Sequence, residues 1–525
     1  MHVGYVSDEY YAALAGVRIE LRGVELRGDD GSVTLTESLP SGAIEVDVAP
    51  GTYDVTLVRS GFGTKRLRVR LEHDRPHSFR LLSDRLLGYA WPKWCRAGND
   101  VEFRVHAVEP YKLALMRHGY ERRLVRNVGW YDDHGPRATA QSIPDGDVSA
   151  TGADWRAGHR GIHLQRIAAP DETGLYYFHA KTTSGAYCSF PLVVAPQVPT
   201  APIAVLASTN TWTAYNPFGG RSNYIMASRL LERPITSAVA DLPRYQSRDY
   251  AEWQFDDYDP LSFDRPEPHN QVREYERATD PIEGRSECHL APAEWRVLAW
   301  LEREGFAYDL YAEADLDDGS LDLDAYRVLL LNTHPEYWSA EMYERAKRWV
   351  FERGGKLVYL GGNGVNCRVE MLDERTLRFH NRWTAGCESR FHAALESEAN
   401  LLGVVYTDAG AMTSAPYRVD RPDHWALRGT AIRAGERFGR RTLHERYGDG
   451  ASGHETDKTS PHTPSGAEVI ATGANRDQGG AEMVHFCTRS GGEVFSAGSI
   501  TFGSALLCDA VCSQITHNVL RQFLG

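Results

Sequence analysis

Three side chains that can do chemistry lie within four positions of one another in the segment NTHPEYWS, residues 332–339: His334, Glu336 and Tyr337. An imidazole, a carboxylate and a phenol can each move a proton or bind a metal ion. Pro335 lies among them, and its ring fixes φ and removes an amide hydrogen, so the turn is stiff. A stiff turn with these groups is a candidate site, although an isolated segment of this kind is more often structural.

The flanking sequence predicts where this turn lies. Residues 326–331 form an apolar run of the length and composition of a buried strand. Ser339 can cap a following helix, whose apolar face is made of Met342, Ala346, Trp349 and Val350. Gly354 and Gly355 end that helix, and residues 356–360 read as the next strand. The turn therefore falls at the carboxyl end of a parallel sheet, where open α/β sheets bind ligands.

The chain of 525 residues is too long for one core, and its pattern changes twice. Residues 1–82 alternate apolar and polar side chains and predict a small β-sandwich, similar to an accessory module of carboxypeptidases. Residues 83–198 predict a second β-sandwich and end near three prolines between 195 and 202. Residues 199–525 alternate strands and helices, which predicts an α/β Rossmann-like domain. Within it we expect strands at 203–207 and 308–311, a helix at 294–305, a hairpin at 483–497 and a last helix at 509–524.

Composition excludes several classes of function. The net charge of -13 repels phosphate backbones and argues against nucleic-acid binding. We see neither an apolar run long enough to span a membrane nor a signal peptide. The eight cysteines form no Cys-x-x-Cys pair, so we expect reduced thiols and a cytoplasmic protein.

Familiar catalytic motifs are missing or altered. The strand at 356–360 runs into a Gly-Gly-Asn-Gly turn, where class I glutamine-amidotransferase-like folds place a nucleophilic cysteine. Asn363 occupies that position, and an amide cannot attack a carbonyl. Zinc motifs are weak, because the one His-x-x-x-His pair, His73 and His77, contains Pro76.

An ordered set of phrases resembles the large (beta) subunit of the N,N-dimethylformamidase family, whose C-terminal domain is amidotransferase-like. The phrases are TWTAYN (211–216), GGRSNY (219–224), HPEY (334–337), GGKLVYLGGNG (354–364), LGVVY (402–406), GASGHETD (450–457) and GGEVFSAGSI (491–500). The resemblance covers most of the chain after about residue 85. It implies a hydrolase of formamides with a mononuclear iron(III) held by two tyrosines and one glutamate.

Carried onto this chain, the resemblance implies that Tyr337 is one tyrosine ligand. We expect the second on the strand before it, as Tyr311, with Tyr308 as the alternative. By spacing we expect Glu388 as the glutamate ligand, ahead of Glu396 and Glu398. Phenolates and carboxylates are hard oxygen donors, which suit iron(III) better than zinc.

The remaining roles follow from the resemblance together with the positions of these residues at the sheet edge. Glu455 is the expected general base, His334 a group that holds Tyr337 or protonates the leaving amine, and His392 the catalytic histidine near the glutamate ligand. Glu336 is expected to be structural. We expect the substrate to be bound by Trp212, Tyr215, Asn216, Tyr224 and Asn363.

The sequence therefore favours an iron-dependent hydrolase of a small amide, with a small helical subunit and a homo-oligomer as expected assemblies. One alternative is a non-amidase or non-catalytic amidotransferase-like protein that acts in carbohydrate or small-molecule binding. Another is a binding protein whose β modules carry the function.

Overall fold

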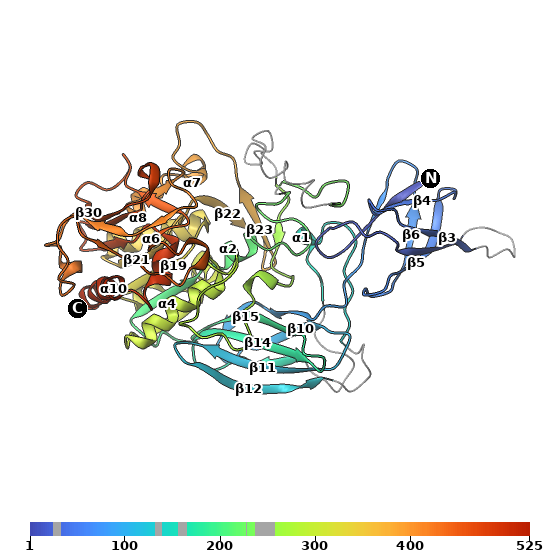
Figure 1. Ribbon diagram of the computed structural model, residues 1–525, viewed down its shortest axis with the longest axis horizontal. Coiled ribbons are helices and arrows are strands. Elements are labelled where there is room, and N and C mark those ends of the chain that lie inside the picture. Colours follow the sequence, from blue (N-terminus) through green and yellow to red (C-terminus); the bar gives the residue numbers. More distant parts are fainter. Residues whose placement is uncertain (25–32, 132–138, 156–164, 227, 237–257) are drawn as a thin grey trace.

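The computed structural model describes residues 1–24, 33–131, 139–155, 165–226, 228–236 and 258–525. Figure 1 shows the N-terminal β module, in blue, at one end of the molecule. A second β module lies beside the larger C-terminal part, which contains most of the helices. The three regions follow the order in which the sequence pattern changes.

The N-terminal module contains two sheets around one core. Their orders are β4-β1-β7 and β3-β2-β5-β6. Val3 and Val6 of one sheet and Ile19, Val55 and Leu57 of the other belong to the same buried cluster. The strands are β1 (His2–Ser7), β2 (Arg18–Gly23), β3 (Val33–Glu37), β4 (Ala43–Glu45), β5 (Gly51–Val58), β6 (Lys65–Leu71) and β7 (His77–Arg80).

The second module is also made of two sheets that share a core. Their orders are β13-β10-β8 and β12-β11-β14-β15-β9. Val101 and Phe103 from one sheet pack with Leu113, Phe178 and Phe190 from the other. The strands are β8 (Leu87–Trp91), β9 (Trp94–Arg96), β10 (Asp100–His106), β11 (Tyr111–His118), β12 (Arg122–Tyr131), β13 (Arg166–Ala168), β14 (Gly174–Thr182) and β15 (Tyr187–Ala195).

The C-terminal part is built on a nine-stranded sheet of order β18-β16-β19-β21-β32-β31-β30-β26-β27. The pairs from β18 to β32 are parallel, and those from β32 to β27 are antiparallel. The strands are β16 (Ile203–Ala207), β18 (Tyr308–Ala312), β19 (Val328–Thr333), β21 (Lys356–Gly361), β26 (Tyr417–Val419), β27 (Arg437–Phe438), β30 (Glu468–Gly473), β31 (Glu482–Cys487) and β32 (Glu493–Ser496).

The parallel strands are buried on both faces because helices cover both. Val328 and Leu330 of β19 pack in one cluster with residues of α4 (Ala291–Arg303) and α10 (Ala510–Leu524). Leu329 and Leu331 pack in the opposite cluster with residues of α6 (Ala340–Arg353). Side chains alternate across a strand, so a continuous apolar run serves both layers.

The turn that the sequence singles out lies between β19 and α6. The Ser339 hydroxyl accepts a hydrogen bond from the Met342 amide at 3.1 Å, and Gly354 ends the helix at φ 78°. Between these points Tyr337–Trp338 forms a short strand, β20, that the sequence did not predict. It pairs with β22 (Cys367–Met371) in a small sheet with β17 (Leu261–Ser262) and β23 (Thr376–His380).

The remaining elements are short and connect these layers. The helices are α1 (Val148–Thr151), α2 (Thr209–Ala214), α5 (Glu313–Asp317), α7 (Arg390–Ala394), α8 (Ala399–Leu402) and α9 (Ile500–Ala505). The strands are β24 (Val405–Thr407), β25 (Ser414–Ala415), β28 (Ser452–Gly453) and β29 (Thr456–Lys458). The 3-10 turns are η3 (Pro268–Asn270), η4 (Leu323–Ala325), η5 (Trp425–Leu427), η6 (Glu445–Tyr447) and η7 (Arg476–Gln478).

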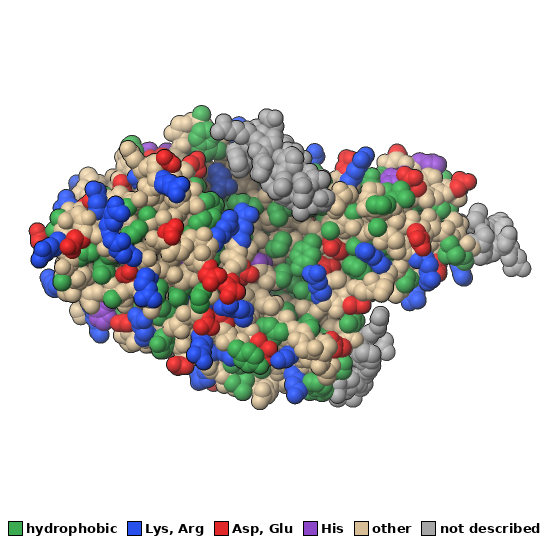
Figure 2. All heavy atoms as spheres, viewed as in Figure 1, with side chains coloured by type: hydrophobic (Ala, Val, Ile, Leu, Met, Phe, Trp, Pro, Cys, Tyr) green, Lys and Arg blue, Asp and Glu red, His purple; other side chains and the backbone are tan. Residues whose placement is uncertain are grey.

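Acidic and basic side chains are interspersed over the face seen in Figure 2 and do not form one large patch of a single sign. All eight cysteines are free thiols. Among the described residues, we find no helix with the length and apolar character needed to cross a membrane.

Candidate active site

The candidate site lies where three parallel strands end. Strand β16 leads through α2 into the loop that carries Tyr215 and Tyr224. Strand β19 leads into the turn with His334 and Glu336, and β21 leads into the turn with Asn363. The carboxyl ends of parallel strands meet at one edge of a sheet, so segments far apart in sequence converge there.

The carboxylate of Glu336 is at the centre of a group of phenols. The Tyr224 hydroxyl donates to Glu336 and lies 2.8 and 2.7 Å from its two oxygens. The hydroxyl oxygens of Tyr224 and Tyr337 are 2.7 Å apart. The Tyr215 hydroxyl donates to that of Tyr224 at 2.7 Å and lies 3.3 Å from Glu336 Oε2. Three phenol oxygens and one carboxylate therefore share one small volume.

Neighbouring polar groups hold this cluster in place. Arg390, the first residue of α7, donates from Nη2 to Glu336 Oε1 at 3.0 Å. The Asn223 side-chain amide donates to the Tyr337 hydroxyl at 3.0 Å. The side-chain amide of Asn381 donates to Asn223 Oδ1 at 2.6 Å. The guanidinium supplies a positive charge beside a carboxylate that is itself fully buried.

Burial keeps the phenols neutral when no cation is near. Burial, with the charge of Glu336 next, raises the pKa of Tyr215, Tyr224 and Tyr337 well above the ordinary value for tyrosine. Burial also raises the pKa of Glu336, against the opposing charges of His334 and Arg390. Phenolate formation here requires a strong positive charge to replace the phenol protons.

A second pair of ionised groups lies beside the phenols. His334 Nε2 is 3.2 Å from Glu455 Oε2 and 3.3 Å from Glu336 Oε2. Burial works against a charged imidazole, but the hydrogen bond and charge of Glu455 outweigh it and raise the pKa of His334. Burial alone would raise the pKa of Glu455, yet His334 lowers it to about 2. At neutral pH Glu455 is therefore a carboxylate, and its charge favours the imidazolium form of His334.

The Gly-Gly-Asn-Gly turn orients Glu455. The Asn363 side-chain amide donates to Glu455 Oε2 at 2.8 Å, and its backbone amide donates to Asp457 Oδ1 at 2.7 Å. The Tyr359 hydroxyl donates to Asp457 Oδ2 at 2.8 Å and accepts from the Gly364 amide at 2.7 Å. Asn363 has φ 52°, in the left-handed region that Asn tolerates better than most residues. The turn thus presents a side-chain amide to the carboxylate of Glu455.

Another group of metal-binding residue types lies next to this site. His444 Nε2 is 3.1 Å from His454 Nδ1, and Cys288 Sγ is 4.0 Å from the same atom. His444 Nδ1 accepts from the Tyr447 backbone amide at 3.2 Å, so its proton is on Nε2 and is donated to His454. A metal ion at Nε2 would require the proton on Nδ1, opposite an amide hydrogen. We therefore interpret this group as a hydrogen-bond chain.

The structure brings six of the residues expected from sequence into the site: Tyr337, Tyr224, Tyr215, His334, Asn363 and Glu455. Two other residues that were expected to bind substrate form hydrogen bonds to neighbouring structural groups. Trp212 donates from Nε1 to buried Glu294 at 2.8 Å. The Asn216 side chain donates to the Pro266 carbonyl at 2.9 Å and so holds the loop.

The expected second tyrosine is not in this group. The hydroxyls of Tyr311 and Tyr326 are 2.6 Å apart, and Tyr311 packs in the cluster on the α6 face of the sheet. Tyr308 donates to Glu302 Oε1 at 3.1 Å instead. Both residues lie on the edge strand β18 and are occupied by other partners.

The expected glutamate ligand and catalytic histidine also lie elsewhere. Glu388 accepts from the Ser397 hydroxyl at 2.5 Å, and its backbone amide donates to His392 Nδ1 at 3.0 Å. The His392 ring packs edge-on against His462. Glu396 pairs with Lys347, and Glu398 accepts from Ser389 at 2.6 Å. These contacts surround α7 and α8, outside the group of phenols.

For three central residues the sequence predicted another role or none. Glu336 was expected to be structural, although it adjoins Tyr337 in the same motif. Arg390 was not singled out, because a single arginine carries no motif. Tyr224 was expected to bind substrate, and its position in the phrase GGRSNY was the available signal that it belongs to the site.

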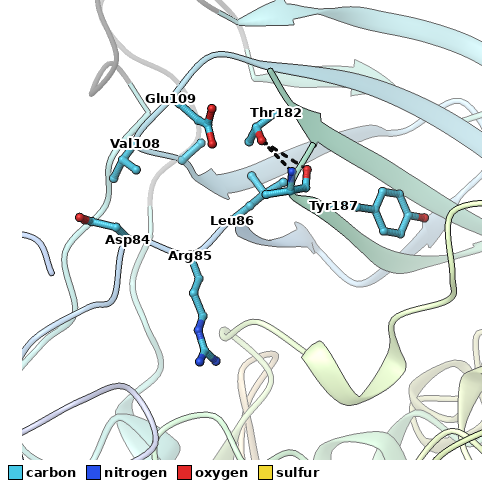
Figure 3. Close-up of a pocket in the computed structure, with 9 residues that line it drawn as sticks. Asp84, Arg85, Leu86, Val108, Glu109, Thr182 and Tyr187 are labelled. Atoms are coloured by element: carbon cyan, nitrogen blue, oxygen red, sulfur yellow. Dashed lines mark hydrogen bonds between the residues drawn. The ribbon is translucent and has the colours of Figure 1, made fainter. Parts of the chain in front are cut away.

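A separate pocket lies on the second β module, where residues 84–86 lead into its first strand (Figure 3). It is lined by Asp84, Arg85, Leu86, Ala107, Val108, Glu109, Thr182, Ala186 and Tyr187. In Figure 3 the Arg85 side chain extends away from Glu109. Glu109 accepts from the Ser184 hydroxyl at 2.5 Å, which gives it a structural partner.

The protein combines β modules with a mixed sheet that helices cover, and the site gathers phenol and carboxylate oxygens at the edge of that sheet. This chain belongs to the family described as N,N-dimethylformamidase beta subunit-like, C-terminal, whose profile matches residues 112–514. It is 29% identical over 288 residues to the N,N-dimethylformamidase beta subunit of Alcaligenes sp, covering 44% of this chain and 37% of that protein. It is 27% identical over 286 residues to the protein of that name from Paracoccus aminophilus, with the same coverage. The match thus spans little more than a third of each relative's length.

Proposed function

We propose that this protein hydrolyses the C–N bond of a small, formamide-like amide. The observation that carries the proposal is the convergence of Tyr224, Tyr337 and Glu336 beside the His334–Glu455 pair. Family membership supports it, because two relatives bear the name of a dimethylformamidase subunit. The run of parallel strands with helices on both faces supports a glutamine-amidotransferase-like fold for the C-terminal part.

The donor set fits a mononuclear iron(III). Tyr224, Tyr337 and Glu336 would hold the ion, with Tyr215 adjoining, and all offer hard oxygen donors. Two phenolates and one carboxylate carry about three negative charges, which a trivalent cation balances. The raised pKa values of the phenols mean that iron uptake must displace protons. Iron bound there would supply Lewis-acid polarisation of an amide carbonyl and acidify water.

The chain's own residues supply the proton transfers. Glu455 is a carboxylate at neutral pH and can accept a proton from the attacking water. Asn363 holds one oxygen of that carboxylate, which fixes the direction of the other. His334 carries a proton on Nε2, because that atom faces two carboxylates, and can donate it to the leaving amine nitrogen. Water then adds to the carbonyl carbon, the C–N bond breaks, and a carboxylic acid and an amine leave.

The nature of the substrate and the assembly follow from the same proposal. A site packed with aromatic rings and two carboxylates favours a small, uncharged amide over an anionic one. We further propose a small helical partner subunit, a homo-oligomer and a cytoplasmic location. Both relatives are named as a beta subunit, which supports the partner.

The proposal is tested by assaying the purified protein, loaded with iron, against formamide, N-methylformamide, N,N-dimethylformamide and acetamide. Release of ammonia or an amine from at least one of these amides is expected, with loss of turnover in Glu455→Gln. An iron-loaded wild type that releases neither from any amide of the panel, with or without an added small subunit, contradicts the proposal.

A further inference from the structure

His289 occupies a position next to the proposed site that no motif indicated. It lies immediately before α4 and is 3% exposed. Its ring packs edge-on against Tyr215 with centroids 4.5 Å apart, and against His334 and His454 at 5.1 Å each. The imidazole therefore packs against Tyr215 and His334 of the site and against His454 of the neighbouring group.

The contact between His289 and His334 is polar and specific. Their Nδ1 atoms are 2.9 Å apart. Two ring nitrogens at that distance share one hydrogen, because two lone pairs or two N–H groups would repel each other. His334 Nε2 must also carry a hydrogen, because it faces the carboxylates of Glu336 and Glu455. His334 is thus held at Nδ1 by His289, and its Nε2 lies 3.3 Å from Glu336 Oε2 and 3.2 Å from Glu455 Oε2.

The hydrogen bond between the two rings fixes the orientation of His334. The shared hydrogen can be carried by either Nδ1 atom, and in both cases the contact sets the rotation of the His334 ring about its χ2 axis.

We propose that His289 is a positioning residue for His334 in amide hydrolysis, a role that rests on the proposed function. The hydrogen bond between His289 Nδ1 and His334 Nδ1 directs the opposite ring nitrogen, Nε2, toward Glu336 and Glu455. Without that hydrogen bond the His334 ring can rotate, and its Nε2 no longer points at the reacting nitrogen. His289 itself touches none of the three residues proposed to hold iron, so it acts on proton transfer and not on metal binding.

Three substitutions separate this role from simple packing. Asn carries Oδ1 and Nδ2 on Cγ, where histidine carries Nδ1, so His289→Asn keeps a hydrogen-bonding group at the right point. His289→Gln has a similar polarity but places its amide one bond further out. His289→Leu fills the space without a hydrogen-bonding group. Each variant is compared with the wild type for iron content, kcat and KM on the amide that the wild type turns over best.

We expect kcat to fall on the order of 100-fold in His289→Gln and His289→Leu, because misplacing a catalytic group by about an ångström costs that much. KM should change less than about threefold, and iron content should stay at the wild-type level. His289→Asn should retain kcat within about tenfold of the wild type. If His289→Leu does not fold, the comparison of His289→Asn with His289→Gln still tests the inference.

Three results would overturn the inference: a kcat near that of the wild type in the Gln or Leu variant, an Asn variant no better than Gln, or loss of iron on substitution. An iron-loaded wild type that turns over no amide would instead contradict the proposed function, and this inference would fall with it. The His289 variants therefore test this inference, and the wild type tests the proposed function.

Discussion

The hydroxyl oxygens of Tyr224 and Tyr337 lie 2.7 Å apart although 113 positions separate them in the chain. One comes from the loop after α2 and the other from the turn after β19. Their meeting also brings Tyr224 to Glu336, since the same hydroxyl touches both. The proposed donor set therefore exists only when strands β16 and β19 are paired in register.

Replacing Tyr224 by Phe keeps the ring and removes the donor oxygen. We expect bound iron to fall at least about tenfold, with the fold retained, because the loss of one supporting or ligating group typically weakens metal affinity by that factor or more. Metal analysis after gel filtration measures this. Tyr311→Phe is the matched control, because its hydroxyl bonds Tyr326 and none of the three phenols of the site, and it should keep its iron. Equal iron in the Tyr224 variant and the wild type would refute this ligand.

Glu336→Gln tests the carboxylate at the centre of the cluster. The amide is similar in size, but it carries no charge and leaves the Arg390 guanidinium without its anion. We expect loss of iron and a lower thermal midpoint, because a buried charge without its partner is costly. Glu388→Gln is the control: Glu388 bonds Ser397, so iron should stay bound. Loss of iron only in the Glu388 variant would favour the ligand expected from sequence spacing.

Much of the fold could be predicted from the sequence, because its layers follow from periodicity. The run at 328–331 is apolar at every position, and it is buried by helices on both faces. The strands at 203–207 and 356–361, the cap at Ser339 and the αL glycine at 354 follow from local patterns for the same reason.

The site was only partly predictable, because partners across the sheet edge depend on loop paths. Spacing along the chain suggested Tyr311 and Glu388, but Tyr311 faces the α6 layer and Glu388 bonds next to α8. Arg390 and His289 meet Glu336 and His334 only through tertiary packing. The local sequence does not predict contacts between residues that are far apart in the chain.

Glu455→Gln should keep iron and lose turnover, because the proposed base is removed and no proposed ligand is touched. We expect kcat to fall about 100-fold or more, as general-base removal usually causes. Amine release by the iron-loaded variant measures the change. Turnover within a few-fold of the wild type would exclude the base role.

Glu455 also predicts a dependence of stability on pH. His334 lowers its pKa to about 2 from an ordinary value of 4.5. An acid with a lowered pKa stabilises the fold above its unfolded pKa, and this contribution is lost as pH falls toward the folded value. The gap in denaturant midpoint between wild type and Glu455→Gln should therefore shrink between about pH 6 and pH 3. A gap that widens as the pH falls would contradict the His334–Glu455 ion pair.

Tyr359→Phe should loosen the turn that carries Asn363. The substitution leaves Asp457 Oδ2 and the Gly364 amide without the phenol hydroxyl that now bonds both. We expect a loss of about 1–3 kcal/mol in unfolding free energy. We also expect a lower kcat, because Asn363 orients Glu455. Tyr311→Phe serves again as control, since it removes a buried hydroxyl without touching the turn. Equal kcat in the two variants would show that the turn needs no such support.

The central claim is that Tyr224, Tyr337 and Glu336 hold iron(III). The most direct measurement is elemental analysis of the purified protein combined with its visible spectrum, in wild type and Tyr224→Phe. The account predicts about one iron per chain and a tyrosinate-to-iron(III) charge-transfer band, both lost in the variant. A wild-type protein that remains colourless and iron-free after exposure to iron, or a variant that keeps both iron and band, would contradict it.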